Sequence, residues 1–67
     1  MRNQIVATGV FGPVYRRKIH IHYKNELTGG EWRYCYSTNA ARTCSEARDR
    51  AAPNFPNSQV KATFAKD

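Results

Sequence analysis

Two histidines separated by one residue, His20 and His22, are the side chains of this sequence best suited to chemistry. On an extended strand such a pair stands on one face, about 7 Å apart. One imidazole could act as the base and the other as the acid of a small ribonuclease, with Arg16 or Lys18 steadying a phosphate. The sequence shows no third residue placed to orient either ring and no glycine-rich phosphate loop. Ribonuclease is therefore the third of three functional hypotheses.

The same histidines could hold a metal ion only with two further ligands. Cys35 or Cys44 could serve if the strands brought them adjacent, but they lie nine residues apart, without the paired spacing of zinc and redox motifs. We therefore expect no metal or other cofactor, and two unpaired thiols in a reducing compartment. A disulfide stays open as an alternative, because one bridge would help so small a core.

A longer basic pattern surrounds the histidines. Residues 14–23 alternate as one strand, with Ile19 and Ile21 on the apolar face. The opposite face then carries a row of bases and imidazoles that is costly to bury and should meet solvent. With two neighbouring arginines this row forms the predicted binding site for nucleic acid or an acidic partner, which comprises Arg16, Arg17, Lys18, His20, His22, Lys24 and Arg33. The alternative is that this row is an ordinary solvated sheet face with no binding function.

Three aromatic residues alternate along the next predicted strand, Trp32, Tyr34 and Tyr36, so all three should share one face. A core this small can hardly spare its only tryptophan, so we expect the aromatic face to point inward and Cys35 to point outward. If the aromatics faced outward, they would form a stacking platform of the kind that single-stranded nucleic acids use. The inward orientation would pack them against Ile19, Ile21, Val60 and Phe64.

Breaks at glycine and proline divide the chain into strands, which we expect at 4–11, 14–23, 31–38 and 58–66. The segment KNELTGGE should connect two of them as a hairpin loop in which glycine takes positive φ. Thr43 and Glu46 have the capping-box spacing, so a short helix should begin there and end before Pro53. Cys44, Ala47 and Ala51 would form its buried face. The order β-β-β-α-β predicts an α+β fold, a small antiparallel sheet with one helix on one face.

Length and charge limit the class of function. At 67 residues the chain should form one domain, and its net charge is +6, with five bases and no acid in residues 1–24. A positive electrostatic field concentrated in one part of the chain favours the binding of polyanions. No stretch has the apolar length of a signal peptide or a membrane span, so we expect a cytoplasmic protein that binds no membrane.

These observations favour a binding protein over an enzyme. The leading hypothesis is a small nucleic-acid-binding protein of a bacterium, phage or mobile element that uses its basic sheet face, with DNA and RNA both open. The alternative is an inhibitor or modulator, as a phage would encode, that docks on an acidic host protein.

Overall fold

A computed structural model describes residues 3–65 of the chain. Its elements follow one another as β1 (Ile5–Gly9), β2 (Gly12–Tyr15), β3 (Ile19–Asn25), β4 (Arg33–Thr38), α1 (Cys44–Ala51), a 3-10 turn (Ala52–Asn54) and β5 (Ser58–Phe64). The predicted α+β class is confirmed, but the strands form two sheets. One is the hairpin β1-β2, and the other has the order β4-β3-β5 with antiparallel neighbours. Residues 3–65 contain no helix that could cross a membrane.

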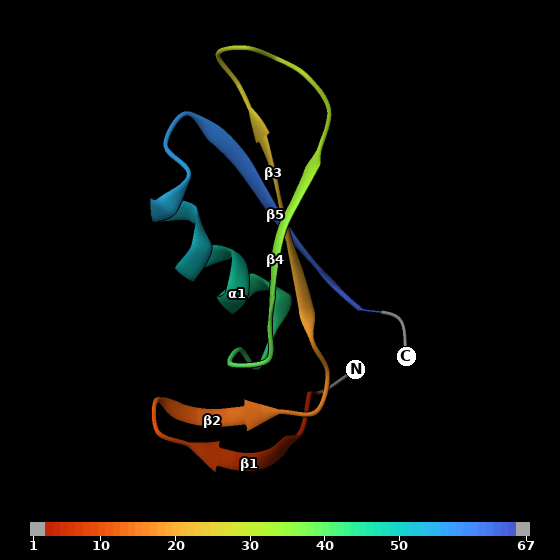
Figure 1. Ribbon diagram of the computed structural model, residues 1–67, viewed down its shortest axis with the longest axis vertical. Helices are drawn as coiled ribbons and strands as arrows, with labels where there is room; N and C mark the ends of the chain where they lie inside the picture. The colour runs from red at the N-terminus through yellow and green to blue at the C-terminus, as the bar shows by residue number, and fades with distance from the viewer. Residues whose placement is uncertain (1–2, 66–67) are drawn as a thin grey trace.

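The first predicted strand, 4–11, is shorter than expected. The chain turns back at Val10 and Phe11, and β1 pairs with β2 from Gly9 opposite Gly12 to Ile5 opposite Tyr15. Gly12 closes this turn with a φ of 124°, a conformation that residues with a Cβ rarely adopt. Figure 1 shows the resulting hairpin at one end of the molecule, beyond the three-stranded sheet.

The prediction of a single strand over 14–23 is wrong, because β2 ends at Tyr15 and β3 begins only at Ile19. The backbone N–H of Arg16 still donates to Gln4 O in the hairpin, at 2.7 Å. Asn3 is buried beside this bend: its Nδ2 donates to the carbonyls of Arg17 and Ala41, and its Oδ1 accepts from Arg17 N. These bonds fasten the bend to a distant segment of the chain, which strand periodicity cannot indicate.

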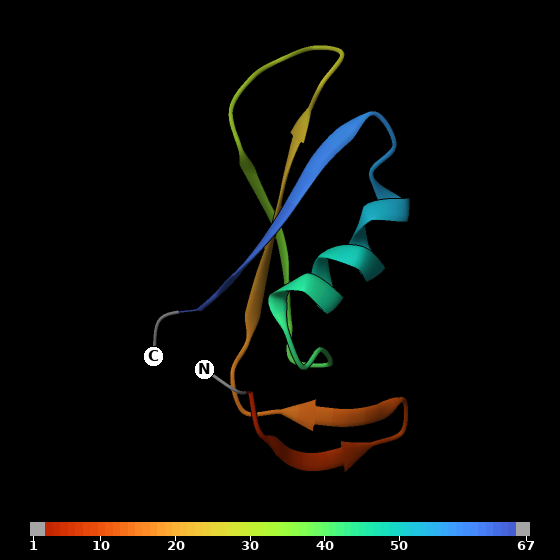
Figure 2. The same ribbon diagram turned by 180° about the vertical axis from the view of Figure 1, so that it is seen from behind.

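The core lies between α1 and the three-stranded sheet, where α1 packs on β3 and β5. Ile19 and Ile21 of β3 are fully buried, as expected, against the small side chains Ala41, Ala47 and Ala51. Val60, Ala62 and Phe64 add partly buried surface from β5, whose alternation is confirmed. Figures 1 and 2 show α1 on one side of this sheet and no other element of residues 3–65 across the opposite side.

The helix and the long hairpin loop follow their sequence signals. Thr43 Oγ1 accepts from Glu46 N at 3.1 Å, so the cap is confirmed, while Glu46 Oε2 reaches back to Arg42 N. Between β3 and β4, Asn25 Oδ1 accepts from two backbone N–H groups of the loop. Gly29 and Gly30 then take positive φ, as expected for this connection.

Candidate functional site

The side of the three-stranded sheet that faces away from α1 is the candidate site, and we call it the open face. Strand register determines its members, because residues opposite each other in an antiparallel pair point to the same side. His20, His22 and Lys24 of β3 lie opposite Thr63, Lys61 and Gln59 of β5. On β4, Ser37 lies opposite His20 and Tyr34 opposite His22.

A bulge in β4 determines which aromatic residues reach the open face. Ile21 pairs with Tyr36 and His22 pairs with Tyr34, which leaves Cys35 as an extra residue without an opposite partner. Tyr34 therefore shares the side of His22, whereas Tyr36 shares the side of Ile21. The prediction that alternation runs unbroken through this strand and places all three aromatic residues on one face is wrong.

The predicted burial of Trp32 is also wrong: 37% of its surface is exposed, and Tyr34 is 55% exposed. The Nζ of Lys61 lies 4.5 Å from the centroid of the Trp32 ring. Lys61 belongs to β5 and lies opposite His22, so its side chain is on the open face. Its contact with Trp32 therefore places the indole over the open face as well. The physical reason is the position of β4 at the edge of the sheet, while α1 covers β3 and β5. The core is closed instead by alanines of α1 and of the segment before it.

The histidines are held in a network of hydroxyl groups. His20 Nδ1 lies 2.6 Å from Ser37 Oγ, and Tyr34 OH lies 2.8 Å from the same oxygen. His22 Nε2 lies 3.4 Å from Thr63 Oγ1. The ring of Tyr34 meets both imidazoles edge-on, with centroids 5.4 and 5.8 Å away. Both histidines are half-buried, so their rings have fixed surroundings but remain in reach of solvent.

The structure brings together only part of the predicted binding site. His20, His22 and Lys24 share the open face, whereas Arg33 lies opposite Tyr23, and Tyr23 stacks on Phe55 on the helix side. The guanidinium of Arg17 lies 4.2 Å from the centroid of the Phe64 ring. Arg16 and Lys18 are exposed in the bend before β3. The predicted continuous row of bases and imidazoles is thus replaced by a shorter stretch of β3 that carries His20, His22 and Lys24.

Sequence reasoning missed Lys61, Thr63 and Ser37. The outward positions of β5 were visible in its alternation, but nothing in the sequence indicated that β5 pairs with β3. Neither Lys24 nor Lys61 forms an ion pair with residues 3–65, whereas two arginines of α1 pair with carboxylates on the same helix. The open face therefore presents cations that no described carboxylate neutralises.

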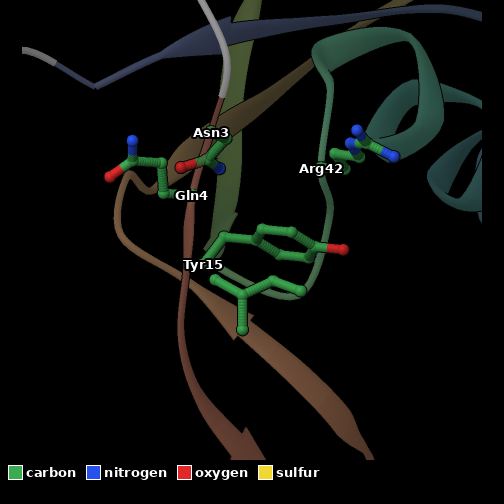
Figure 3. A pocket seen from close by; sticks show the side chains of 5 residues that line it. Asn3, Gln4, Tyr15 and Arg42 are labelled. Carbon is green, nitrogen blue, oxygen red and sulfur yellow. The ribbon is translucent and has the colours of Figure 1, made fainter.

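One other feature, a pocket, lies away from the open face. A pocket of about 340 Å³ sits between the hairpin and the segment before α1, lined by Asn3, Gln4, Ile5, Tyr15 and Arg42 (Figure 3). It contains one cation and none of the histidines. As for metal ions, no three His, Cys, Asp or Glu side chains within the described part of the chain are grouped to hold one. Cys35 and Cys44 are both free thiols.

No known protein family, curated protein or solved structure matches this chain.

Proposed function

We propose that this protein binds single-stranded nucleic acid through the open face of its three-stranded sheet. The observation that carries the proposal is the exposure of Trp32 and Tyr34 among lysines and histidines. An aromatic ring offers a stacking surface to any base, and nearby cations attract the phosphates that link the bases. A domain this small gains little by leaving its only tryptophan outside the core. Stacking with a base would explain why the tryptophan side chain is exposed.

The spacing of the two rings suits an extended strand of nucleic acid. Trp32 directly precedes β4 and Tyr34 is the second residue of that strand, so about 6.6 Å separates them if the chain is extended. This leaves room for one base at each ring. Duplex DNA keeps its bases stacked on one another, so it cannot use both rings without being opened.

Lys61 is a cation of the open face that also contacts the stacking surface of Trp32. In the free protein its ammonium covers the Trp32 ring at 4.5 Å, a favourable cation–π contact. A phosphate bound nearby would draw this ammonium away and uncover the ring for a base. Lys24 lies on the neighbouring strand of the same face and supplies a second cation.

Titration of fluorescently labelled single-stranded RNA, single-stranded DNA and duplex DNA at low and moderate salt tests the proposal. We expect single strands to bind more tightly than the duplex. Two or three phosphate contacts give a slope of log affinity against log salt of about −1.4 to −2.1. No detectable binding to either single strand at low salt would contradict the proposal.

The matched variants are Lys24→Glu on the open face and Arg48→Glu on α1. Both reverse one positive charge, so the change in net charge is equal, but Arg48 lies on the other side of the sheet and pairs with Asp49. Lys24→Glu should weaken binding to every sequence alike. An equal loss in both variants would indicate attraction by net charge alone and would contradict a localised site.

A second candidate function, binding to an acidic host protein, is favoured by the hairpin. Val10 and Phe11 at its tip are almost fully exposed, and Ile5 and Val6 of β1 are each 60% exposed. Exposed apolar groups of this kind often mark protein contacts, and the outer edge of a strand can pair with a partner. Pull-down from a lysate with and without nuclease treatment separates the two functions. A protein retained after nuclease treatment would favour this second candidate.

A further inference from the structure

His20 and His22 form the most closely organised cluster of reactive side chains on the open face. Their ring centroids lie 6.3 Å apart, and each ring has one nitrogen near a hydroxyl group of a neighbouring strand. Ser37 of β4 holds one ring, and Thr63 of β5 holds the other. The sequence showed no residue that could orient either imidazole. The structure provides one for each.

We propose that these two imidazoles cleave single-stranded RNA bound on the open face, an inference that rests on the proposed binding function. Cleavage of RNA within the chain needs one group that removes a proton and one that donates a proton, on either side of a single phosphate. Two imidazoles that each form a hydrogen bond of about 2.6–3.2 Å to opposite oxygens of one phosphate lie about as far apart as the rings of His20 and His22 do. A 6.3 Å centroid separation therefore suits one phosphodiester.

The reaction is a transesterification that needs no metal and no other reactant. A neutral imidazole takes the proton of the ribose 2′-hydroxyl, and the 2′-oxygen forms a bond to the adjacent phosphorus. The bond from phosphorus to the 5′-oxygen breaks, and the protonated second imidazole donates a proton to that oxygen. The products are a 2′,3′-cyclic phosphate and a 5′-hydroxyl. Which histidine acts as the base depends on the direction in which the RNA crosses β3.

Neighbouring groups support this chemistry. Lys61 lies opposite His22 in the sheet, where its charge can stabilise the negative charge that develops on the phosphate oxygens. Trp32 and Tyr34 hold the flanking bases by stacking, which fixes the phosphate between the two imidazole rings. DNA has no 2′-hydroxyl and should bind without being cut.

The experiment uses three strands of one sequence: RNA, 2′-O-methyl RNA and DNA. We expect all three to bind and only RNA to be cleaved, in the presence of EDTA, with a 2′,3′-cyclic phosphate as the first product. The rate should fall on both sides of an optimum pH, because one imidazole must be neutral and the other protonated. Binding of 2′-O-methyl RNA without any cleavage of RNA would overturn the cleavage proposal and leave the binding function intact. Absence of both would overturn both.

Variants separate the protein's own activity from a contaminating nuclease. His20→Gln and His22→Gln should each lower the cleavage rate by about a hundredfold or more, and their affinity for 2′-O-methyl RNA by far less. Arg48→Glu, purified in the same way, should cleave like the wild type. Circular dichroism checks that each variant is folded. Undiminished cleavage by the double variant His20→Gln/His22→Gln, or products that carry a 5′-phosphate, would overturn the proposal.

Discussion

Replacing Trp32 with alanine should weaken binding of single-stranded nucleic acid while the domain stays folded. Trp32 is 37% exposed and lies outside the cluster of buried residues around Ile19 and Ile21. Its contact with Lys61 is one favourable interaction that the substitution removes from the free protein. The indole therefore contributes more to the complex than to the fold.

The magnitudes follow from these contacts. Loss of one base-stacking ring costs about 1–3 kcal/mol of binding free energy, which corresponds to about 5- to 150-fold in the dissociation constant. Loss of an exposed cation–π contact costs about 0.5–1 kcal/mol of unfolding free energy, and loss of the apolar surface that the partly exposed ring buries adds to this cost. A tryptophan packed in the core would instead cost about 3–5 kcal/mol, enough to unfold a domain of marginal stability.

Fluorescence anisotropy of a labelled strand measures the affinity, and urea unfolding followed by circular dichroism measures the stability. Tyr36→Ala is the matched control. It removes an aromatic ring of almost equal exposure, 38%, only four residues further along the chain, but the bulge at Cys35 turns Tyr36 towards the helix side. This variant should bind like the wild type.

Three results would refute the reasoning. If Trp32→Ala unfolded while Tyr36→Ala remained stable, the indole would belong to the core and the open face would lack its first stacking ring. If Trp32→Ala were stable and bound as tightly as the wild type, stacking on Trp32 would contribute nothing to affinity. Equal losses of affinity in both variants would show that the two rings are not on different faces.

Three further predictions concern the fold. Ile21→Ala should lower the unfolding free energy by about 2–5 kcal/mol, because Ile21 is fully buried; an unchanged urea midpoint would contradict this. Thr43→Ala should cost about 1 kcal/mol by removing the cap on Glu46 N, and Thr43→Asn, which can also cap, should keep the thermal midpoint of the wild type. Under non-reducing conditions, Cys35 and Cys44 should both be alkylated, the exposed Cys35 faster; an unlabelled product lighter by two hydrogens would reveal a disulfide.

Local backbone signals in the sequence predicted much of the fold. Alternation in β5 indicated which of its residues face the core, and the same pattern indicated Ile19 and Ile21 in β3. Thr43 marked the start of α1 because its side chain satisfies an N–H group only three residues away. Such signals succeed because side-chain direction and capping depend on a few neighbouring residues.

The composition of the open face, by contrast, was decided by tertiary structure. The bulge at Cys35 places Tyr34 beside His22 and turns Tyr36 to the other side, and pairing of β3 with β5 brings Lys61 and Thr63 to the histidines. The bend at residues 16–18 depends on Asn3 and Ala41, which are 38 positions apart. Strand neighbours, register and bulges depend on contacts between distant residues, and a one-residue shift in register exchanges the two faces of a strand. Alternation alone could therefore identify two faces of β4 but could not determine which aromatic residues meet solvent.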